Sequence, residues 1–315
     1  FFSMSKKKYL KQRELLHHWE SFDNTYLAKV DDYSLLPFLK SADLMIVMEH
    51  FGKGLVVEPY IPTVILAGGL ISKLGSEEQK NSIIPEIISG NIRCAFAYAE
   101  PQSRFDLNDV KTSAVLNGDD YVLNGFKSVV FGAGMASHLI ISARTEGEQR
   151  SESGITLFIV DTKSEGLTLQ NYPTIDEYRA SEVIIENLKV SKDNVLGKVN
   201  MAYDAIEEIV DISTIAACSE AVGILQVLKD STTEYCKNRK QFGQSIAKNQ
   251  VIQHRLVDMM IEYEQAKSIL YMAVTADLSS SDERKKVVSA AKARIGKAIK
   301  FVGESGFVSN CRILA

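Results

Sequence analysis

Acidic side chains on one predicted helix are the first groups in this chain that could take up a proton. Residues 203–237 have helical periodicity, and the segment carries Glu207, Glu208, Asp211 and Glu220. For the first three carboxylates, a solvated or capping helix face is the ordinary alternative. Glu220 lies among small and apolar residues, so we expect burial to raise its pKa.

A second group of residues could bind phosphate. Arg239 opens the run RKQFGQSI, which ends at Ile246 and is followed by Asn249 and Gln250. The planar guanidinium of arginine donates paired hydrogen bonds to phosphate oxygens. The run therefore predicts a phosphate contact, and a solvated charge at a helix end is the alternative.

Composition excludes several other classes of site. The net charge is −4 and basic residues are scattered, so we expect no nucleic-acid partner. The four cysteines form no CxxC pair, which favours buried free thiols in a reducing compartment over metal ligands or disulfides. They are Cys94, Cys218, Cys236 and Cys311.

The sequence also predicts a cytoplasmic protein with no membrane span. It has no run of about 18 apolar residues, the length that a transmembrane helix needs. Its first residues, FFSMSKKK, are too polar for the apolar core of a signal peptide.

Helical patterns position the start of the chain, and we assign residues 1–91 to an N-terminal α domain. Apolar-rich runs at 42–51 and 61–74 predict two helices. Ser76 and Gln79 then form a capping box for a third helix. Pro85 predicts a kink in that helix, or a start later than the cap indicates.

Residues 92–196 form a predicted central β domain. Segments rich in β-branched and aromatic residues alternate with turn signals, which is typical of a small barrel or sandwich. Residues 117–120 predict a hairpin turn. Asn124-Gly125 predicts a second hairpin, of type I′, before a strand at 126–131.

Residues 197–315 form a predicted C-terminal helical bundle. Long helical segments at 203–237, 251–278 and 282–302 favour a four-helix bundle, and the fold class is α+β. There is no βαβ alternation. Gly132-Ala-Gly134 is not followed by a helix-forming run, so it is not a dinucleotide fingerprint.

Several motifs occur in an order that resembles the acyl-CoA dehydrogenase family. They are CAFAYAEPQSRFDLNDVKT at 94–112, DDYVLNGFK at 119–127, RKQFGQSI at 239–246 with LVDM at 256–259, and ARIGKA at 293–298. The resemblance covers nearly the whole chain. It implies an N-terminal α domain, a central β domain and a C-terminal bundle, with FAD as cofactor and an acyl-CoA thioester as substrate.

The resemblance also implies a set of cofactor contacts. One face of the flavin ring would meet Phe96, Tyr98 and Ala99, and its other side would meet Val129, Val130 and Phe131. Arg239, Gln241 and Phe242 would reach the pyrophosphate and adenosine from a neighbouring subunit, assisted by Asn249 and Gln250. Ordinary strand packing is the alternative for Phe96 and Tyr98.

The chain departs from the family pattern where cofactor and thioester should be touched. Family members carry T-E-P-G-x-G-S-D, and this chain has AEPQSRFD at 99–106. Ala99 replaces the threonine, Gln102 and Arg104 replace glycines, and Phe105 replaces the serine near the thioester. Val129 stands where the family has a tryptophan.

The catalytic base is the largest departure. Most members place a glutamate after an H-G-G-x-G loop near the end of the bundle, and that loop is absent here. We expect sequence to be missing after Gly306 and near Phe38.

A minority of members use a glutamate in the first bundle helix. Ser213 occupies that position here, and Thr214 replaces the arginine that follows. Asp211 is the nearest acid, so it is the candidate base. Phe105, Asp211 and Thr214 are the candidate substrate contacts.

The motif at 99–107 resembles small subunits of pimeloyl-CoA-type and steroid-side-chain-type dehydrogenases. This implies FAD-dependent α,β-dehydrogenation in fatty-acid or steroid side-chain β-oxidation, by one subunit of a heterotetramer whose homologous partner shares the FAD. Electron-transfer flavoprotein would be the electron acceptor. A self-sufficient homotetramer and a catalytically degenerate scaffold subunit are the alternatives, and the sequence does not identify the acyl group.

Overall fold

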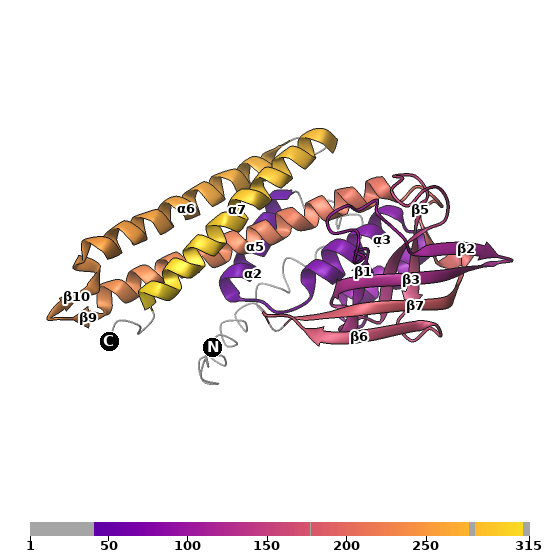
Figure 1. Ribbon diagram of the computed structural model, residues 1–315, viewed down its shortest axis with the longest axis horizontal. Helices are drawn as coiled ribbons and strands as arrows, with labels where there is room; N and C mark the ends of the chain where they lie inside the picture. The colour runs from indigo at the N-terminus through magenta and orange to yellow at the C-terminus, as the bar shows by residue number, and fades with distance from the viewer. Residues whose placement is uncertain (1–40, 177, 277–280, 311–315) are drawn as a thin grey trace. The chain divides into compact units, whose positions relative to one another are not determined.

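The computed structural model describes residues 41–176, 178–276 and 281–310 of the 315-residue chain. These ranges contain an N-terminal group of helices, a β-sheet and a C-terminal group of helices (Figure 1). This is the predicted α+β order. The expectations that fall on residues 1–40, and Cys311, lie outside the described residues.

The N-terminal helices match the predicted apolar runs, with one change of helix type. They are α2 (Ser41–Gly54), the π-helix η2 (Ile61–Gly68), α3 (Gly69–Leu74) and α4 (Glu77–Ile88). The capping box is confirmed, because Ser76 accepts from the Gln79 amide and Gln79 accepts from the Ser76 amide. Helix α4 begins directly after this cap and contains Pro85, so a later start is wrong.

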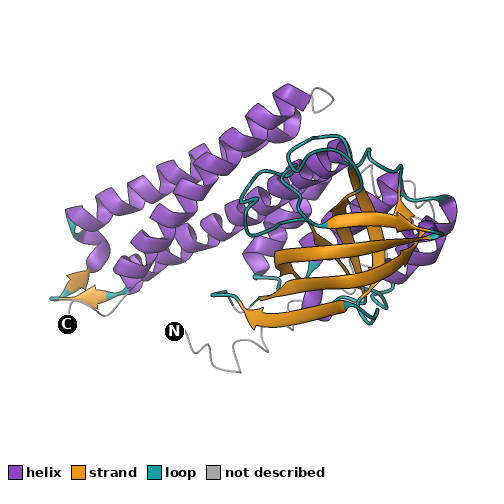
Figure 2. Cartoon of the chain, turned by 45° about the vertical axis from the view of Figure 1, so that its right-hand side comes forward, coloured by secondary structure: helices purple, strands orange, loops and turns teal. Residues whose placement is uncertain are grey.

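Eight strands form a single sheet, drawn in orange in Figure 2. Its order is β6-β7-β3-β2-β4-β5-β8, and β1 pairs in parallel with β4. Buried apolar side chains from most of these strands form one core. The strands are β1 (Cys94–Ala97), β2 (Ser113–Asn117), β3 (Asp120–Phe131), β4 (His138–Arg144), β5 (Ile155–Asp161), β6 (Leu167–Pro173), β7 (Arg179–Ser191) and β8 (Val195–Leu196).

The hairpin predicted at Asn124-Gly125 is wrong. Strand β3 continues through both residues, and its pairing with β7 only shifts register there. The Asn124 side chain accepts from the Asn187 amide, at 2.8 Å. A Cβ on Gly125 would lie 2.5 Å from Thr112 Oγ1, so the glycine serves a close approach of two segments.

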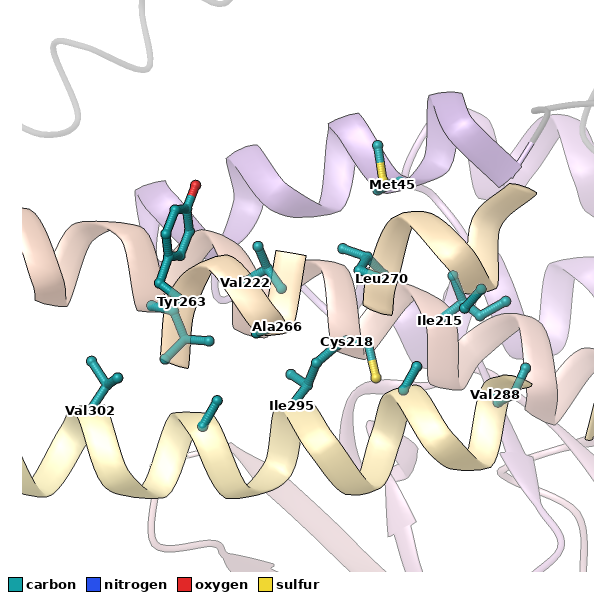
Figure 3. Packing of buried hydrophobic residues seen from close by; sticks show 14 of the residues in the cluster. Met45, Ile215, Cys218, Val222, Tyr263, Ala266, Leu270, Val288, Ile295 and Val302 are labelled. Carbon is teal, nitrogen blue, oxygen red and sulfur yellow. The ribbon is translucent and has the colours of Figure 1, made fainter. Parts of the chain in front are cut away.

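Three long helices make up the C-terminal part of the described chain. They are α5 (Tyr203–Asn238), α6 (Gln250–Thr275) and α7 (Ser281–Asn310). A short hairpin of β9 (Lys240–Gln241) and β10 (Gln244–Ser245), then the 3₁₀ turn η5 (Ile246–Lys248), join α5 to α6. Buried residues of the three helices, including Cys218, Val222 and Tyr263, share one apolar core with Met45 of α2 (Figure 3).

Helix α2 supplies a fourth helix against this group, because glycines let its backbone touch α5. A Cβ on Gly52 would lie 1.9 Å from the Glu220 carbonyl oxygen, and one on Gly223 would lie 2.0 Å from the Glu49 carbonyl oxygen. No side chain fits at either position without separating the two helices. Among the helices of the described ranges, none has the length and apolar character that crossing a membrane requires.

Replacing one of these glycines tests the contact. We expect Gly223→Ala to lower the free energy of unfolding by about 2–3 kcal/mol, because the new methyl group overlaps the α2 backbone. Gly296→Ala on α7 is the matched control, since its Cβ meets no atom within 4 Å. It should raise stability by about 0.5–1 kcal/mol through helix propensity. Urea unfolding measures both, and equal effects would refute the close contact.

Candidate functional site

Two segments predicted to contact the cofactor lie side by side at the ends of β1 and β3. Tyr98 and Ala99 follow β1, and Val129 and Phe131 end β3. The backbone N–H of Ser128 donates to the Ala99 carbonyl oxygen, at 2.9 Å, which joins the two segments. We call Tyr98, Ala99, Val129 and Phe131 the β3 platform.

The platform residues differ in exposure from the other predicted contacts. Val129 is 45% exposed and Phe131 is 49% exposed, whereas Val130 between them is 2% exposed and packs in the core. Phe96 is 3% exposed, and its ring centroid lies 4.9 Å from that of Tyr98. Phe96 and Val130 therefore support the platform from the protein interior rather than line its surface.

A buried ion pair lies beneath the platform. Lys127 Nζ is 2.7 Å from Glu100 Oε1, and the two side chains are 0% and 2% exposed. The same carboxylate oxygen accepts from Thr112 Oγ1 at 2.7 Å and from the Thr112 amide at 3.1 Å. Its second oxygen accepts from the Lys111 amide and from Gln102 Nε2, both at 2.8 Å.

Both partners of this pair are charged at neutral pH. Burial lowers the pKa of Lys127 to about 8, although the Glu100 charge opposes that shift. Burial raises the pKa of Glu100, but the Lys127 charge and the hydrogen bonds from Lys127, Gln102 and Thr112 together hold it below its ordinary value. The pair is thus a protonated lysine and an ionised glutamate.

Gln102, Arg104 and Phe105 lie on the loop between β1 and β2. The Gln102 side-chain amide bridges Glu100 and Asp109, donating to Asp109 Oδ1 at 3.2 Å. Arg104 has a left-handed backbone with φ +49°. Phe105 is 89% exposed, and Lys292 Nζ of α7 lies 5.6 Å from its ring centroid. Phe105 therefore links the loop after β1 to α7.

The candidate base lies in an ion-pair network that joins α5 to α7. Asp211 Oδ2 accepts from Arg284 Nε at 2.7 Å. Glu207 receives Arg284 Nη2 at 3.5 Å and Lys285 Nζ at 2.8 Å. Burial raises the pKa of Asp211, and the Arg284 hydrogen bond and charge oppose that rise. These contacts give both carboxylates a role in holding the two helices together.

Hydroxyl groups fill the neighbouring positions on α5. Ser213 Oγ and Thr214 Oγ1 both donate to the Val210 carbonyl oxygen, at 3.0 and 2.8 Å. Neither residue is ionisable at neutral pH, so neither supplies a base. Glu220 is half-buried, and burial raises its pKa as predicted.

The predicted phosphate-binding residues form a separate group at the other end of α5. Arg239 ends the helix, Gln241 and Phe242 form the β9–β10 hairpin, and Asn249 and Gln250 begin α6. All five are exposed. Phe242 is 98% exposed and sits in the two-residue turn with φ +53°, beside Gly243 with φ +80°.

The length of α5 separates this group from the β3 platform. The helix has 36 residues, which corresponds to about 54 Å. Its first half contacts the N-terminal helices, through the Lys73–Glu208 ion pair and the close approach of Gly69 to Ile209. The middle of α5 is the part that packs near the platform, because Ala216 shares a core cluster with Ile61 and a Cβ on Gly132 would meet Pro62. Arg239 lies 23 residues further along the helix, which corresponds to about 35 Å.

A depression elsewhere holds none of the predicted residues. It has a volume of about 470 Å³ and lies between α4, the start of β4 and the end of β5. His138, Asp161 and Asp193 are among its lining residues. It is not part of the β3 platform.

Sequence reasoning missed the Glu100–Lys127 pair, although strand alternation carried a signal for it. Tyr121 and Leu123 face the core of the sheet, so the alternation directs residue 127 of the same strand inward as well. A lysine at an inward position requires a buried acid. Glu100, which follows the apolar β1, was the available partner.

The buried pair is testable by a double-mutant cycle. We expect Glu100→Gln to lower the free energy of unfolding by about 3–5 kcal/mol, because buried Lys127 then either stays charged without its partner or gives up its proton. The double variant Glu100→Gln/Lys127→Met should lose less than either single variant. Asp119→Asn, which breaks the exposed Lys192–Asp119 pair, should cause no measurable change.

The Glu100–Lys127 pair also predicts how the free energy of unfolding depends on pH. The pKa of Glu100 is lowered by folding, so its contribution is present above its unfolded pKa and is lost as pH falls through the folded value. Denaturant titrations below pH 5 should show a steeper loss for the wild type than for Glu100→Gln. Parallel curves would contradict an ionised buried Glu100.

Two family models match the chain. The acyl-CoA dehydrogenase middle-domain model matches residues 95–188, and the C-terminal-domain model matches residues 203–306. Both segments correspond to parts of the described structure, the first to the sheet and the second to α5–α7.

Curated relatives are similar over most of the chain. A 3-(aryl)acrylate reductase of Clostridium sporogenes is 32% identical over 250 residues, 76% of this chain and 66% of that protein. The caffeyl-CoA reductase-Etf complex subunit CarC of Acetobacterium woodii is 35% identical over 213 residues, 67% of this chain and 56% of that one. The human mitochondrial short-chain specific acyl-CoA dehydrogenase is 30% identical over 84% of this chain and 67% of its own length. The chain thus spans 56–66% of the first two relatives.

Solved structures show the same fold. A structure reported in work on the electron transferring flavoprotein of Acidaminococcus fermentans has a TM-score of 0.77 and 27% identity, and the match covers 86% of this chain and 72% of that one. A glutaryl-coenzyme A dehydrogenase in complex with glutaryl-CoA has a TM-score of 0.78 and 22% identity, with coverage of 99% and 87%.

Proposed function

This chain belongs to the acyl-CoA dehydrogenase family, and we propose that it binds FAD and acts on the bond between the α and β carbons of an acyl-CoA thioester. The observation that carries the proposal is the β3 platform, where the exposed side chains of Val129 and Phe131 lie beside Tyr98 and Ala99, next to the buried Glu100–Lys127 pair. The fold, the two matched family models and the order of the motifs support it.

The residues present fit a flavin ring. Val129 and Phe131 are large apolar side chains that stay half exposed beside Tyr98 and Ala99, a setting that suits a planar aromatic ligand. When bound, FAD would supply the hydride acceptor or donor for the β-carbon. The protein would orient the flavin ring and exclude water from it. Ala99 brings no hydroxyl to that contact.

A neighbouring chain would complete the cofactor site. Arg239 and Phe242 are exposed at the C-terminal end of α5, about 35 Å of helix beyond Ala216, which packs near the platform. An almost fully exposed phenylalanine in a strained turn is suited to insertion into another surface. We propose that this hairpin contacts the FAD of an adjacent subunit, with Gln241, Asn249 and Gln250 beside it.

The partner subunit would also supply the catalytic base. Ser213 stands at the base position used by a minority of the family, and Asp211 is engaged by Arg284. We therefore favour one subunit of a heteromeric enzyme over a self-sufficient homotetramer, and a non-catalytic scaffold subunit stays an alternative. A bulky or carboxylated acyl group, as in the pimeloyl-CoA and steroid-side-chain branch, is part of this proposal.

The reverse reaction is a second candidate. Two relatives are named as reductases, one for 3-(aryl)acrylate and one within a caffeyl-CoA reductase-Etf complex. In that direction the β-carbon receives a hydride and the α-carbon receives a proton, with electrons supplied by electron-transfer flavoprotein. An unsaturated acyl-CoA would then be the substrate.

Flavin content and turnover test the function. We expect the full-length chain, purified with its co-expressed partner, to hold FAD, and the flavin absorbance to bleach with a saturated acyl-CoA. Arg239→Ala should lower flavin content at least tenfold through loss of a phosphate contact. Lys237→Ala, an exposed charge in the last turn of α5, is the matched control. A complex without flavin refutes the proposal. Re-oxidation of reduced flavin only by unsaturated acyl-CoA supports the reverse reaction.

The role of Asp211 is a separate test. We expect Asp211→Asn to lower the free energy of unfolding by about 1–3 kcal/mol, because Arg284 loses a charged partner. We expect the rate constant for flavin reduction, measured in single-turnover kinetics, to change less than tenfold. A loss of a thousandfold or more at unchanged stability would instead identify Asp211 as the base.

A further inference from the structure

A β-bulge interrupts the pairing of β3 with β7 at the platform. Lys127 pairs with Val183 and Val130 pairs with Ser181, so Ser128 and Val129 together face only Glu182. Such bulges re-aim side chains and are over-represented beside active sites. Strands β6, β7 and β3 lie next to one another here (Figure 1).

The bulge contains an unfavourable backbone conformation. Val129 has φ +53°, in the left-handed region where a β-branched side chain is sterically disfavoured. Such a conformation persists only when the surrounding contacts hold it. The contacts of residues 128 and 129 therefore identify what holds the bulge.

Two neighbouring segments hold the bulge through its successive amides. The Ser128 N–H donates to the Ala99 carbonyl oxygen, at 2.9 Å. Burial, followed by the hydrogen bond to Glu182 and its charge, raises the pKa of Tyr172, and a polar contact with the Val129 backbone opposes that rise. Tyr172 Oη in turn donates to Glu182 Oε1, at 3.0 Å.

Glu182 has a further anomaly. Its second oxygen, Oε2, is buried and has no hydrogen-bond partner among the described residues. A buried carboxylate oxygen left unpaired reduces stability. An unpaired buried polar atom of this kind calls for an explanation.

We propose that Tyr172 and Glu182 are positioning residues that hold the Ser128–Val129 bulge, and with it the exposed faces of Val129 and Phe131, in the conformation that receives the flavin ring. The inference rests on the proposed function, because it assigns FAD to the platform. The pair acts through Val129 and does not touch the reacting atoms.

Measuring flavin affinity together with thermal stability distinguishes residues that position the flavin-binding bulge from residues that only stabilise the fold. FAD binding to the full-length protein is measured by flavin fluorescence, and unfolding by a thermal scan without FAD. We expect Tyr172→Phe to weaken FAD binding at least tenfold and to shift the visible absorbance of bound flavin. Glu182→Gln keeps an oxygen that accepts from Tyr172, so its FAD affinity should stay within threefold of the wild type.

The double variant Tyr172→Phe/Glu182→Leu keeps the test valid if Tyr172→Phe alone does not fold. It removes the Tyr172–Glu182 hydrogen bond and the orphan oxygen together, so its melting temperature should fall less than that of Tyr172→Phe while FAD binding still falls at least tenfold. Tyr203→Phe is the matched control. Its phenol also donates to a carboxylate, Glu207 at 3.1 Å, but on α5. It should leave FAD affinity and the flavin spectrum unchanged.

Wild-type affinity and an unchanged flavin spectrum in both Tyr172→Phe and the double variant would overturn the positioning role and leave the proposed function standing. A wild-type protein that binds no FAD, alone or with its partner, would overturn both.

Discussion

The Glu100–Lys127 ion pair fixes the geometry on which the rest of the site depends. A fully buried lysine is tolerated only when a charged partner lies at hydrogen-bond distance, so the chain must bring Glu100 to β3 in order to fold. That requirement places the segment after β1 against the end of β3. The Glu100 carboxylate also accepts hydrogen bonds from Thr112, Lys111 and Gln102. These bonds fix the path of the loop up to β2.

The departures from the family motif become intelligible from this arrangement. The Gln102 side-chain amide, at a position where the sequence comparison expects a glycine, bridges the buried carboxylates of Glu100 and Asp109. Phe105 takes the place of a small polar residue and extends toward Lys292 of α7. In this chain the loop makes one cation–π contact with α7, and the surface of β3 stays exposed.

Local signals in the sequence predicted the elements well, and signals that depend on distant contacts did not. The capping box at Ser76 and the three long C-terminal helices follow from residues close in sequence. Asn124-Gly125 has the local signal of a hairpin, but pairing with β7 overrides it and Gly125 serves a contact with Thr112. The burial of Phe96 and Val130, and the bulge opposite Glu182, likewise depend on partners far along the chain. Arg239 lies far along α5 from the platform. The helical periodicity of the sequence indicates how long this helix is, but matching short motifs gives no information on the distance between them.

The length of α5 has a genetic consequence. If the platform of one chain and the hairpin of another build each flavin site, a defect in either element is not confined to its own subunit. Where two copies of this chain share a site, a copy damaged at Val129 and a copy damaged at Arg239 would complement each other in a mixed oligomer. One assembled site would receive both intact halves, and its counterpart would receive both damaged ones. The activity of such a protein would depend on which two subunits meet at each interface, and not on whether any single chain is intact.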